Sequence, residues 1–472
     1  ERMGEKFKHY FIDEFQDTSK LQWGNLKPLI ENSLLAENLK QEQGTAMLVG
    51  DAKQAIYRWR GGEAEQFINL YTKKAQPFPI EQFVDNLPTN YRSLEEIIKF
   101  NNAFFKQVST MVFSNADYKN LYYQGANQNT FKTEEGYVQL DFLVLKDQER
   151  DVVFPEKVLE NIKFCQENNF QYKDICVLVR KKDQGVAIAQ FLHAAGVPII
   201  SSETMLIFKS TTVQFINHVL QLLVQPNNEE IKILVLNFLV KKFQVEDKHA
   251  FFSKLVKKPL FQIFKALESY NIYINPNKLI QLPLYELVET IVQNFALVKK
   301  PNAYVQFYLD FVLTYSQKQG SNLLGFLEHA EAKKESLSIV APLEQNAVQI
   351  MTIHKSKGLE FPVVIFPYAD LNIYKEVEPK EWFPLQAENY QGFTCTLLNY
   401  NKKFGEYGEV GQQIYETHEA ALELDNINLL YVACTRAVEQ LFIVSNENLT
   451  KTKKEKPQTY AELFNAYLKA NN

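Results

Sequence analysis

Two short, uninterrupted apolar runs near the start of the chain constrain its fold most strongly. They run from Tyr10 to Asp13 and from Ala46 to Gly50. Continuous apolar runs of this length are typical of strands buried on both faces of a parallel sheet. Between them, Ser19 and Gln22 form a capping-box pattern that predicts the start of a helix. A strand, a helix and a strand at this spacing predict a right-handed crossover unit, and hence an α/β fold.

The remaining sequence predicts a helical block inserted into an α/β domain. The 472 residues suggest about three domains. A stretch rich in Leu, Phe and Lys, from about Ser210 to Pro342, predicts helices and contains few strand signals. Strand signals lie on both sides of this stretch. Gly136 to Phe142 alternates like a strand, and further strand signals occur at Ile175 to Val179, Val348 to Met351, Val363 to Phe366 and Leu441 to Val444.

Composition excludes several classes of protein. No run of about 18 uncharged apolar residues occurs, which argues against a membrane span. The net charge of −5 argues against a protein that coats nucleic acid, so we expect any DNA contact in a local groove. The cysteines are scattered without a Cys-x-x-Cys pair, which argues against a zinc or iron–sulfur site and fits a reducing cytoplasm. They are Cys165, Cys176, Cys395 and Cys434.

Two acidic residues, Asp13 and Glu14, end the first apolar run. Open α/β sheets bind ligands at the carboxyl ends of their strands. There, an aspartate can hold Mg²⁺ on nucleotide phosphates, and a glutamate can orient or deprotonate the attacking water. An acidic turn after a strand is the plainer alternative. A two-metal nuclease cluster that includes Asp17 and Asp51 is another, although we expect those two residues to cap turns.

A second polar segment follows the second apolar run and ends at Gly61. It places Gln54 where a neutral amide could sense a γ-phosphate. Tyr57, Trp59 and Arg60 combine aromatic faces with a cation. Stacking on unpaired bases is worth about 1–3 kcal/mol per base and needs no particular sequence. The alternative is an aromatic core cluster, against which the flanking arginines and glycines argue.

Taken together and in order, these segments resemble motifs of the superfamily-one DNA helicases of the UvrD/Rep/RecB type. The five matching segments are Asp13 to Thr18, Gly50 to Gly61, Leu87 to Ser93, Thr352 to Phe361 and Leu430 to Arg436. The resemblance covers nearly the whole chain, and features such as Gln22-Trp23 favour the RecB/AddA-like branch. It implies partial and complete RecA-like parallel-sheet motor domains with an inserted all-helical accessory domain. It also implies three-prime to five-prime movement on DNA.

The resemblance implies ATP and Mg²⁺ as ligands and gives each matching residue a role. Asp13 would ligate the metal ion, Glu14 would be the catalytic base, and Gln54 would sense the γ-phosphate. Arg92 and Arg436 would reach the same phosphate across a cleft. For either arginine alone, a surface salt bridge is the alternative.

The resemblance also implies contacts of further residues with the nucleoside and with DNA. Tyr91 would stack on adenine and Glu360 would hydrogen-bond the ribose. The residues implied to contact single-stranded DNA are Tyr57, Trp59, Arg60 and His354. For His354, a structural hydrogen bond remains an equal alternative. Lys355 and Lys357 would either touch backbone phosphates or face solvent.

One expected motif is missing: no Gly-x-x-x-x-Gly-Lys-Ser/Thr loop occurs, because no glycine is followed by lysine. We therefore expect that the chain was cut from a longer protein. By itself, the chain would bind nucleotide poorly and hydrolyse none. Residues 1–77 would be the last part of a first motor domain. Residues 78–205 and 345–472 would form the second motor domain, and residues 206–344 the accessory insertion.

Two hypotheses about function follow. In the first, the parent protein is an ATP-dependent DNA helicase and translocase of recombination or repair. It would act in the cytoplasm on single-stranded and duplex DNA, and a further partner would be a nuclease or a second helicase–nuclease subunit. In the second, the chain is a naturally truncated, non-catalytic subunit that binds DNA or a partner helicase. The intact motifs argue against this second hypothesis.

Overall fold

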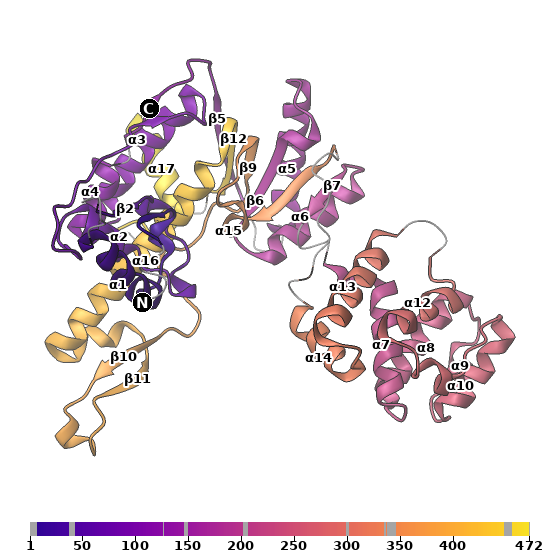
Figure 1. Ribbon diagram of the computed structural model, residues 1–472. Coiled ribbons are helices and arrows are strands. Elements are labelled where there is room, and N and C mark those ends of the chain that lie inside the picture. The colour runs from indigo at the N-terminus through magenta and orange to yellow at the C-terminus, as the bar shows by residue number, and fades with distance from the viewer. Residues whose placement is uncertain are drawn as a thin grey trace. The chain divides into compact units, whose positions relative to one another are not determined.

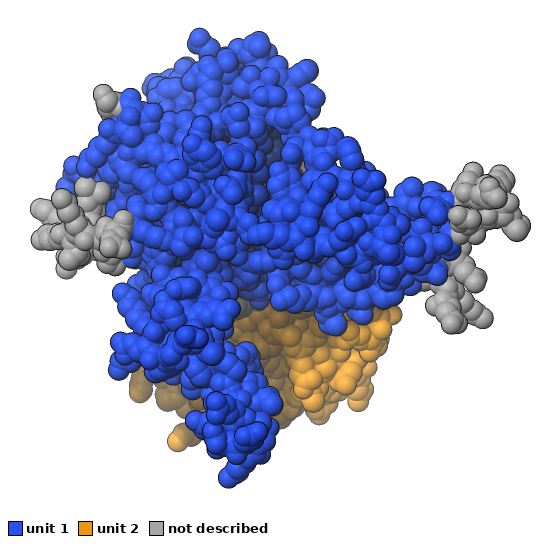
Figure 2. Space-filling model, turned by 90° about the vertical axis from the view of Figure 1, so that its left-hand side faces the viewer, with its two compact units in different colours: residues 1–199, 346–472 blue, residues 200–345 orange. Residues whose placement is uncertain are grey.

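The chain forms two compact units in a computed structural model. Unit 1 comprises residues 1–199 and 346–472, and unit 2 comprises residues 200–345 (Figure 2). The structure describes residues 7–36, 43–125, 127–145, 150–201, 206–298, 302–334, 337, 346–447 and 456–471. Residues 205, 344 and 345, where the sequence places limits of the inserted block, lie outside the described residues.

Unit 1 opens with the predicted strand–helix–strand unit. Strands β1 (His9–Ile12) and β2 (Thr45–Leu48) pair in parallel, and α1 (Lys20–Leu35) connects them. The predicted capping box is confirmed, because Ser19 and Gln22 exchange hydrogen bonds between side chain and backbone N–H at the start of α1.

The prediction that these two strands are buried on both faces is wrong. Phe11 and Met47 lie opposite each other in the register and are 66% and 58% exposed. No described element covers the face that these two side chains share. An apolar run therefore predicted the strands correctly but not the burial of their second face.

A six-stranded parallel sheet forms the centre of unit 1 and confirms the predicted α/β class. The later strand signals of the sequence lie in its strands, except that Gly136 immediately precedes β5. In spatial order these are β5 (Tyr137–Leu143), β12 (Ala437–Asn446), β9 (Phe361–Phe366), β6 (Ile175–Val179), β8 (Val348–Thr352) and β7 (Ile199–Ser201).

Helices cover both faces of this sheet (Figure 1). Because side chains alternate along a strand, β6 sends Ile175, Val177 and Val179 into one core cluster and Cys176 and Leu178 into another. The first cluster includes residues of α5 (Arg150–Glu167) and α6 (Lys182–Ala194). The helices that contribute to the second are α2 (Ala64–Tyr71), α3 (Glu95–Met111), α4 (Ala116–Tyr123), α15 (Ile353–Ser356), α16 (Gly408–Cys434) and α17 (Tyr460–Asn471).

Two small strand pairs complete unit 1, and the sequence did not predict either. β3 (Thr89–Asn90) pairs in parallel with β4 (Asn129–Thr130). β10 (Lys380–Pro384) and β11 (Cys395–Asn399) form an antiparallel hairpin that extends away from the six-stranded sheet (Figure 1).

Beyond the end of β7, the named elements of unit 2 within its described residues are helices, and the unit has a core of its own. The helices are α7 (Thr211–Val224), α8 (Glu229–Phe243), α9 (Lys248–Leu255), α10 (Leu260–Ala266), α11 (Pro276–Leu279), α12 (Leu284–Asn294), α13 (Ala303–Gln319) and α14 (Leu323–Lys333). The predicted helical block is thus confirmed. Over the described parts of both units, we find no helix whose length and apolar character would suffice to cross a lipid bilayer.

Candidate functional site

Asp13 and Glu14 lie where β1 ends, at the carboxyl edge of the strand pair. Both side chains are exposed. Glu14 has a left-handed backbone, with φ of 52°, and its N–H donates to Asp13 Oδ1 at 2.8 Å. The next residue, Phe15, donates its N–H to the carbonyl of Val49 after β2. This tight turn presents both carboxylates at one edge, as the sequence predicts.

Gln16, which the sequence did not single out, connects the ends of the two strands. Its Nε2 donates to Glu14 Oε2 at 2.6 Å, and its Oε1 accepts from the N–H of Asp51 at 3.1 Å. The side chain is buried beneath Gly50, where a Cβ atom would lie 2.3 Å from Gln16 Oε1. A side chain at position 50 would therefore force the amide of Gln16 to move from its hydrogen bond with Asp51.

Lys357 pairs with the acidic turn. It therefore does not face solvent, and its ammonium group is directed to carboxylates and not towards the backbone phosphates of DNA. Its Nζ lies 3.0 Å from Glu14 Oε2 and also contacts Asp17. The lysine side chain is only 7% exposed. Asp17 therefore serves as an ion-pair partner, and burial raises the pKa of its carboxyl group although Lys357 opposes the shift.

Gln54 lies between the second strand and the distant Arg436, which ends the last matching segment. Asp51 caps the turn Ala52–Gln54, as predicted, and accepts from Gln54 Nε2 at 3.1 Å. The amide oxygen of Gln54 accepts from Arg436 Nη2 at 3.4 Å. The structure thus brings together two site residues that are 382 positions apart.

Arg436 is a buried cation whose hydrogen bonds go to neutral oxygens. It is 1% exposed and donates to the carbonyls of Val432 at 3.0 Å and Leu359 at 3.3 Å, and to Thr435 Oγ1 at 3.0 Å. Among the described residues, no carboxylate forms an ion pair with it. Burial and the nearby Arg92 lower its pKa to about 10. A buried charge without a counter-charge is unfavourable, so this position favours an anionic ligand.

Arg92 lies beside Arg436 and is held by a residue that the resemblance assigns to the ribose. Its Nε donates to Glu360 Oε2 at 2.8 Å, and its Nη1 donates to the carbonyl of Thr435 at 3.3 Å. Arg92 thus forms the surface salt bridge that the sequence left as an alternative.

Tyr91 is 65% exposed and packs against Phe131, with ring centroids 4.8 Å apart.

The residues predicted to contact single-stranded DNA also come together. We call Tyr57, Trp59 and His354 the aromatic cluster, because their ring centroids lie 5.9–6.3 Å apart. Tyr57 donates its hydroxyl to the carbonyl of His354 at 2.9 Å. Trp59 is 71% exposed, which excludes an ordinary core role for it, and Arg60 lies 5.5 Å from its ring. The cluster therefore presents ring faces and a cation to solvent.

Arg180 belongs to the same region, although the sequence did not single it out. It follows β6, so its position at the carboxyl end of a buried strand was the available signal. Its Nη1 lies 3.4 Å from His354 Nδ1. Burial, with a contribution from Arg180, lowers the pKa of His354 to about 4. His354 is therefore neutral at pH 7.

The donor groups of this region fit a nucleotide better than a cluster of metal ions. The described residues contain no group of three or more His, Cys, Asp or Glu side chains that could hold a metal, so they do not support the nuclease alternative. A single carboxylate such as Asp13 suits a Mg²⁺ ion that phosphate oxygens also coordinate. Arg436 and Arg92 provide the cations that such phosphates require.

Comparison with known proteins agrees with this arrangement. The family model of the UvrD-like helicase C-terminal domain matches residues 86–448, and that of the UvrD/REP helicase N-terminal domain matches residues 1–75. A protein of Ligilactobacillus salivarius, described as a subunit of an ATP-dependent helicase/nuclease, is 25% identical over all of this chain and 42% of the relative. Proteins of the same description from Lactobacillus gasseri and Listeria welshimeri are each 24% identical, over 96% and 93% of this chain.

The chain spans about 40% of the length of these curated relatives. The C-terminal family model alone covers well over half of the 472 residues, and the segments it includes supply Arg92, His354, Glu360 and Arg436. The matched sequences therefore include the distant segments that the structure brings together at Gln54 and Arg436. On these grounds the chain belongs to the UvrD-like helicase family.

Proposed function

We propose that the chain provides much of the motor of an ATP-dependent DNA helicase of recombination or repair, moving three-prime to five-prime. The observation that best supports this proposal is the buried guanidinium of Arg436, which lacks a carboxylate partner among the described residues and contacts Gln54. Such a group needs an anion that arrives from outside the fold. A nucleotide γ-phosphate beside Glu14 and Gln54 would supply one.

Within this proposal, the two sides of the site divide the work of phosphoryl transfer. Asp13 would hold the Mg²⁺ ion of ATP, which neutralises phosphate charge when bound. Glu14, which Gln16 and Lys357 orient, would accept a proton from the attacking water. Charge that develops on the transferred phosphoryl group would be stabilised by Arg92 and Arg436.

The nucleoside and DNA contacts follow from exposed groups. Tyr91 would stack on adenine and Glu360 would bind the ribose. The aromatic cluster with Arg60 would stack on unpaired bases and approach the backbone of single-stranded DNA. Because Tyr57 and Gln54 lie on one short segment, nucleotide and DNA would bind to neighbouring parts of the same segment.

Two further parts of the proposal concern groups outside this chain. The sequence contains no phosphate-binding glycine–lysine loop, so a chain of this sequence is expected to bind nucleotide weakly and not to hydrolyse it. The relatives are described as one subunit of a helicase/nuclease. We therefore propose that the active assembly acts on single-stranded and duplex DNA together with a nuclease or a second helicase–nuclease subunit.

Fluorescence anisotropy of a labelled oligo(dT), together with an ATPase assay, tests the proposal. The chain should bind oligo(dT), and Trp59→Ala should weaken binding about tenfold or more, as expected from the loss of base stacking. Trp382→Ala is the matched control, because Trp382 is 61% exposed and lies on the β10–β11 hairpin. That variant should bind like the original chain.

Three results would count against the proposal. Equal effects of the two tryptophan substitutions would refute the DNA role of the aromatic cluster. Robust ATP turnover by this chain alone would refute the need for a phosphate loop. Because weak nucleotide binding is expected, only DNA binding that shows no response even to millimolar nucleotide or pyrophosphate would favour the non-catalytic DNA-binding subunit instead.

A further inference from the structure

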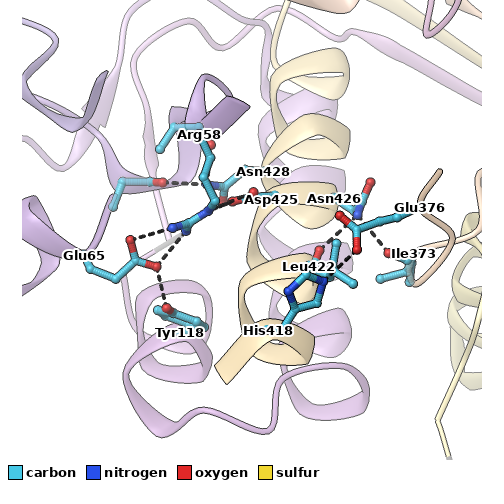
Figure 3. A network of polar contacts seen from close by, with 12 residues as sticks. Arg58, Glu65, Tyr118, Ile373, Glu376, His418, Leu422, Asp425, Asn426 and Asn428 are labelled. Atoms are coloured by element: carbon cyan, nitrogen blue, oxygen red, sulfur yellow. Dashed lines mark hydrogen bonds and ion pairs between the residues drawn. The ribbon is translucent and has the colours of Figure 1, made fainter. Parts of the chain in front are cut away.

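Arg58 lies between two residues of the aromatic cluster in sequence, but its guanidinium is directed elsewhere. Its Nε donates to both carboxylate oxygens of Asp425 at 2.9 Å, and its Nη1 and Nη2 donate to Glu65 at 3.0 and 2.6 Å (Figure 3). Tyr118 donates its hydroxyl to Glu65 at 2.7 Å. Each nitrogen of the guanidinium thus has a protein carboxylate as its partner.

The segment that includes Arg58 is attached along one helix, α16. Asp425 holds Arg58, and one turn later Asn428 donates to the carbonyls of Ala52 and Ala55 at 2.8 and 2.9 Å. Arg436, just after the helix, contacts Gln54. The contacts therefore follow one another from the aromatic cluster at one end of the segment to the candidate γ-phosphate contact at the other.

We propose that Arg58 and Asp425 form a positioning pair that sets the affinity of the aromatic cluster for an unpaired DNA strand. The pair fixes the short turn Arg58–Arg60 to α16, and this turn includes Trp59. Trp59 is then presented to the strand in one orientation, so less conformational freedom is lost when a base stacks on it. This inference rests on the proposed DNA-binding function and adds two residues that need not touch DNA.

A direct contact of Arg58 with a DNA phosphate is the competing explanation, and the two make opposite predictions for Asp425→Asn. The amide has nearly the same shape and can still accept a hydrogen bond from Arg58, but it no longer pairs with its charge. If Arg58 binds phosphate, the loss of the competing charge of Asp425 should tighten DNA binding. If the pair positions the aromatic cluster, binding should weaken.

The experiment measures the dissociation constant of the chain for a labelled oligo(dT) at several salt concentrations. We expect Asp425→Asn to weaken binding about three- to tenfold, and Arg58→Met to weaken it by a similar factor. Neither substitution should change the slope of log K against log salt. Loss of a phosphate contact by Arg58 would instead lower that slope by about one unit for the Met variant.

Matched variants separate positioning from a general loss of stability. Asp425→Glu retains the charge and should recover most of the affinity. Arg150→Met removes another arginine that pairs with an aspartate in unit 1, Asp370, and should bind oligo(dT) like the original chain. Circular dichroism melting confirms that each variant is folded at the assay temperature.

The possible outcomes are distinct. If the original chain does not bind oligo(dT), the proposed function fails and this inference fails with it. If the chain binds but Asp425→Asn binds equally well or more tightly, only the positioning role is overturned. Weaker binding with an unchanged salt slope and recovery by Asp425→Glu would support it.

Discussion

The buried amide of Asn428 is expected to be one of the most sensitive positions in unit 1. It is fully buried and makes three short hydrogen bonds. Two are donated to the carbonyls of Ala52 and Ala55, and one is accepted from the hydroxyl of Tyr122 at 2.6 Å. Asn428→Ala removes all three bonds in the protein interior, and of their partners only the carbonyl of Ala52 keeps another bond within the described residues, from the N–H of Ala55 at 3.3 Å.

The size of the effect follows from this count. A hydrogen bond contributes about 1 kcal/mol net, and a buried polar group that loses its partner costs about 1–3 kcal/mol. For three lost bonds, the free energy of unfolding of unit 1 should fall by about 3 kcal/mol or more. The Asn428→Ala substitution should also displace Gln54, because the turn that includes Gln54 is attached to α16 through the same two carbonyls.

Urea unfolding followed by tryptophan fluorescence measures this loss selectively. The three tryptophans of the chain, Trp23, Trp59 and Trp382, all lie in unit 1, so their emission reports on that unit. Asn217→Ala is the matched control in unit 2, where a buried asparagine accepts from the hydroxyl of Tyr308 at 3.3 Å.

The control should leave the fluorescence transition unchanged while it lowers the stability of the helical unit seen by circular dichroism. A loss below about 1 kcal/mol for Asn428→Ala would refute the reasoning, because it would show that the three bonds add little net stability. An equal shift of the fluorescence transition by Asn217→Ala would refute the assignment of that signal to unit 1.

Three further predictions use the same protein. Gly50→Ala should lower the free energy of unfolding by about 1–3 kcal/mol in urea, because the new Cβ would collide with Gln16. The folded-state pKa of His354, about 4, lies below its usual 6.5, so stability should be lost as pH falls from 6.5 towards 4. His354→Gln should remove about 1 kcal/mol of that loss near pH 5 in acid titrations; an unchanged pH profile would contradict this. Millimolar pyrophosphate should raise the melting temperature of the original chain and of Arg150→Met but not of Arg436→Met, and equal protection of all three would exclude Arg436 as the anion site.

Much of the fold followed from apolar patterns because inner strands of the large sheet are buried on both faces. β6 is an example, since every residue from Ile175 to Val179 is buried. The β10–β11 hairpin escaped prediction because β10 mixes charged, aromatic and proline residues and alternate side chains of both strands are exposed. The exposure of Phe11 escaped for a different reason, because a sequence run does not show what covers a strand.

The candidate site was predictable where motifs name chemistry and unpredictable where partners are distant. Gln54 and Arg436 stood out from their motifs, and the structure places them in contact. The pairing of Lys357 with Glu14 could not be predicted, because the two residues belong to segments that are far apart in the sequence and come together only in the fold. Arg58 was overlooked because its neighbours suggested a ligand, whereas its own partner lies 367 residues away.

The order of strands in the large sheet has a consequence for how the chain is made. β6 pairs with β8 and β9, and the whole of unit 2 is encoded between them. During synthesis, which proceeds from the N-terminus, β6 leaves the ribosome long before its partners exist. Unit 2 can complete its core meanwhile, because all of its helices are already present. An uninterrupted apolar strand therefore waits unpaired through the synthesis of an entire helical unit, and this interval is when the nascent chain most needs protection from aggregation.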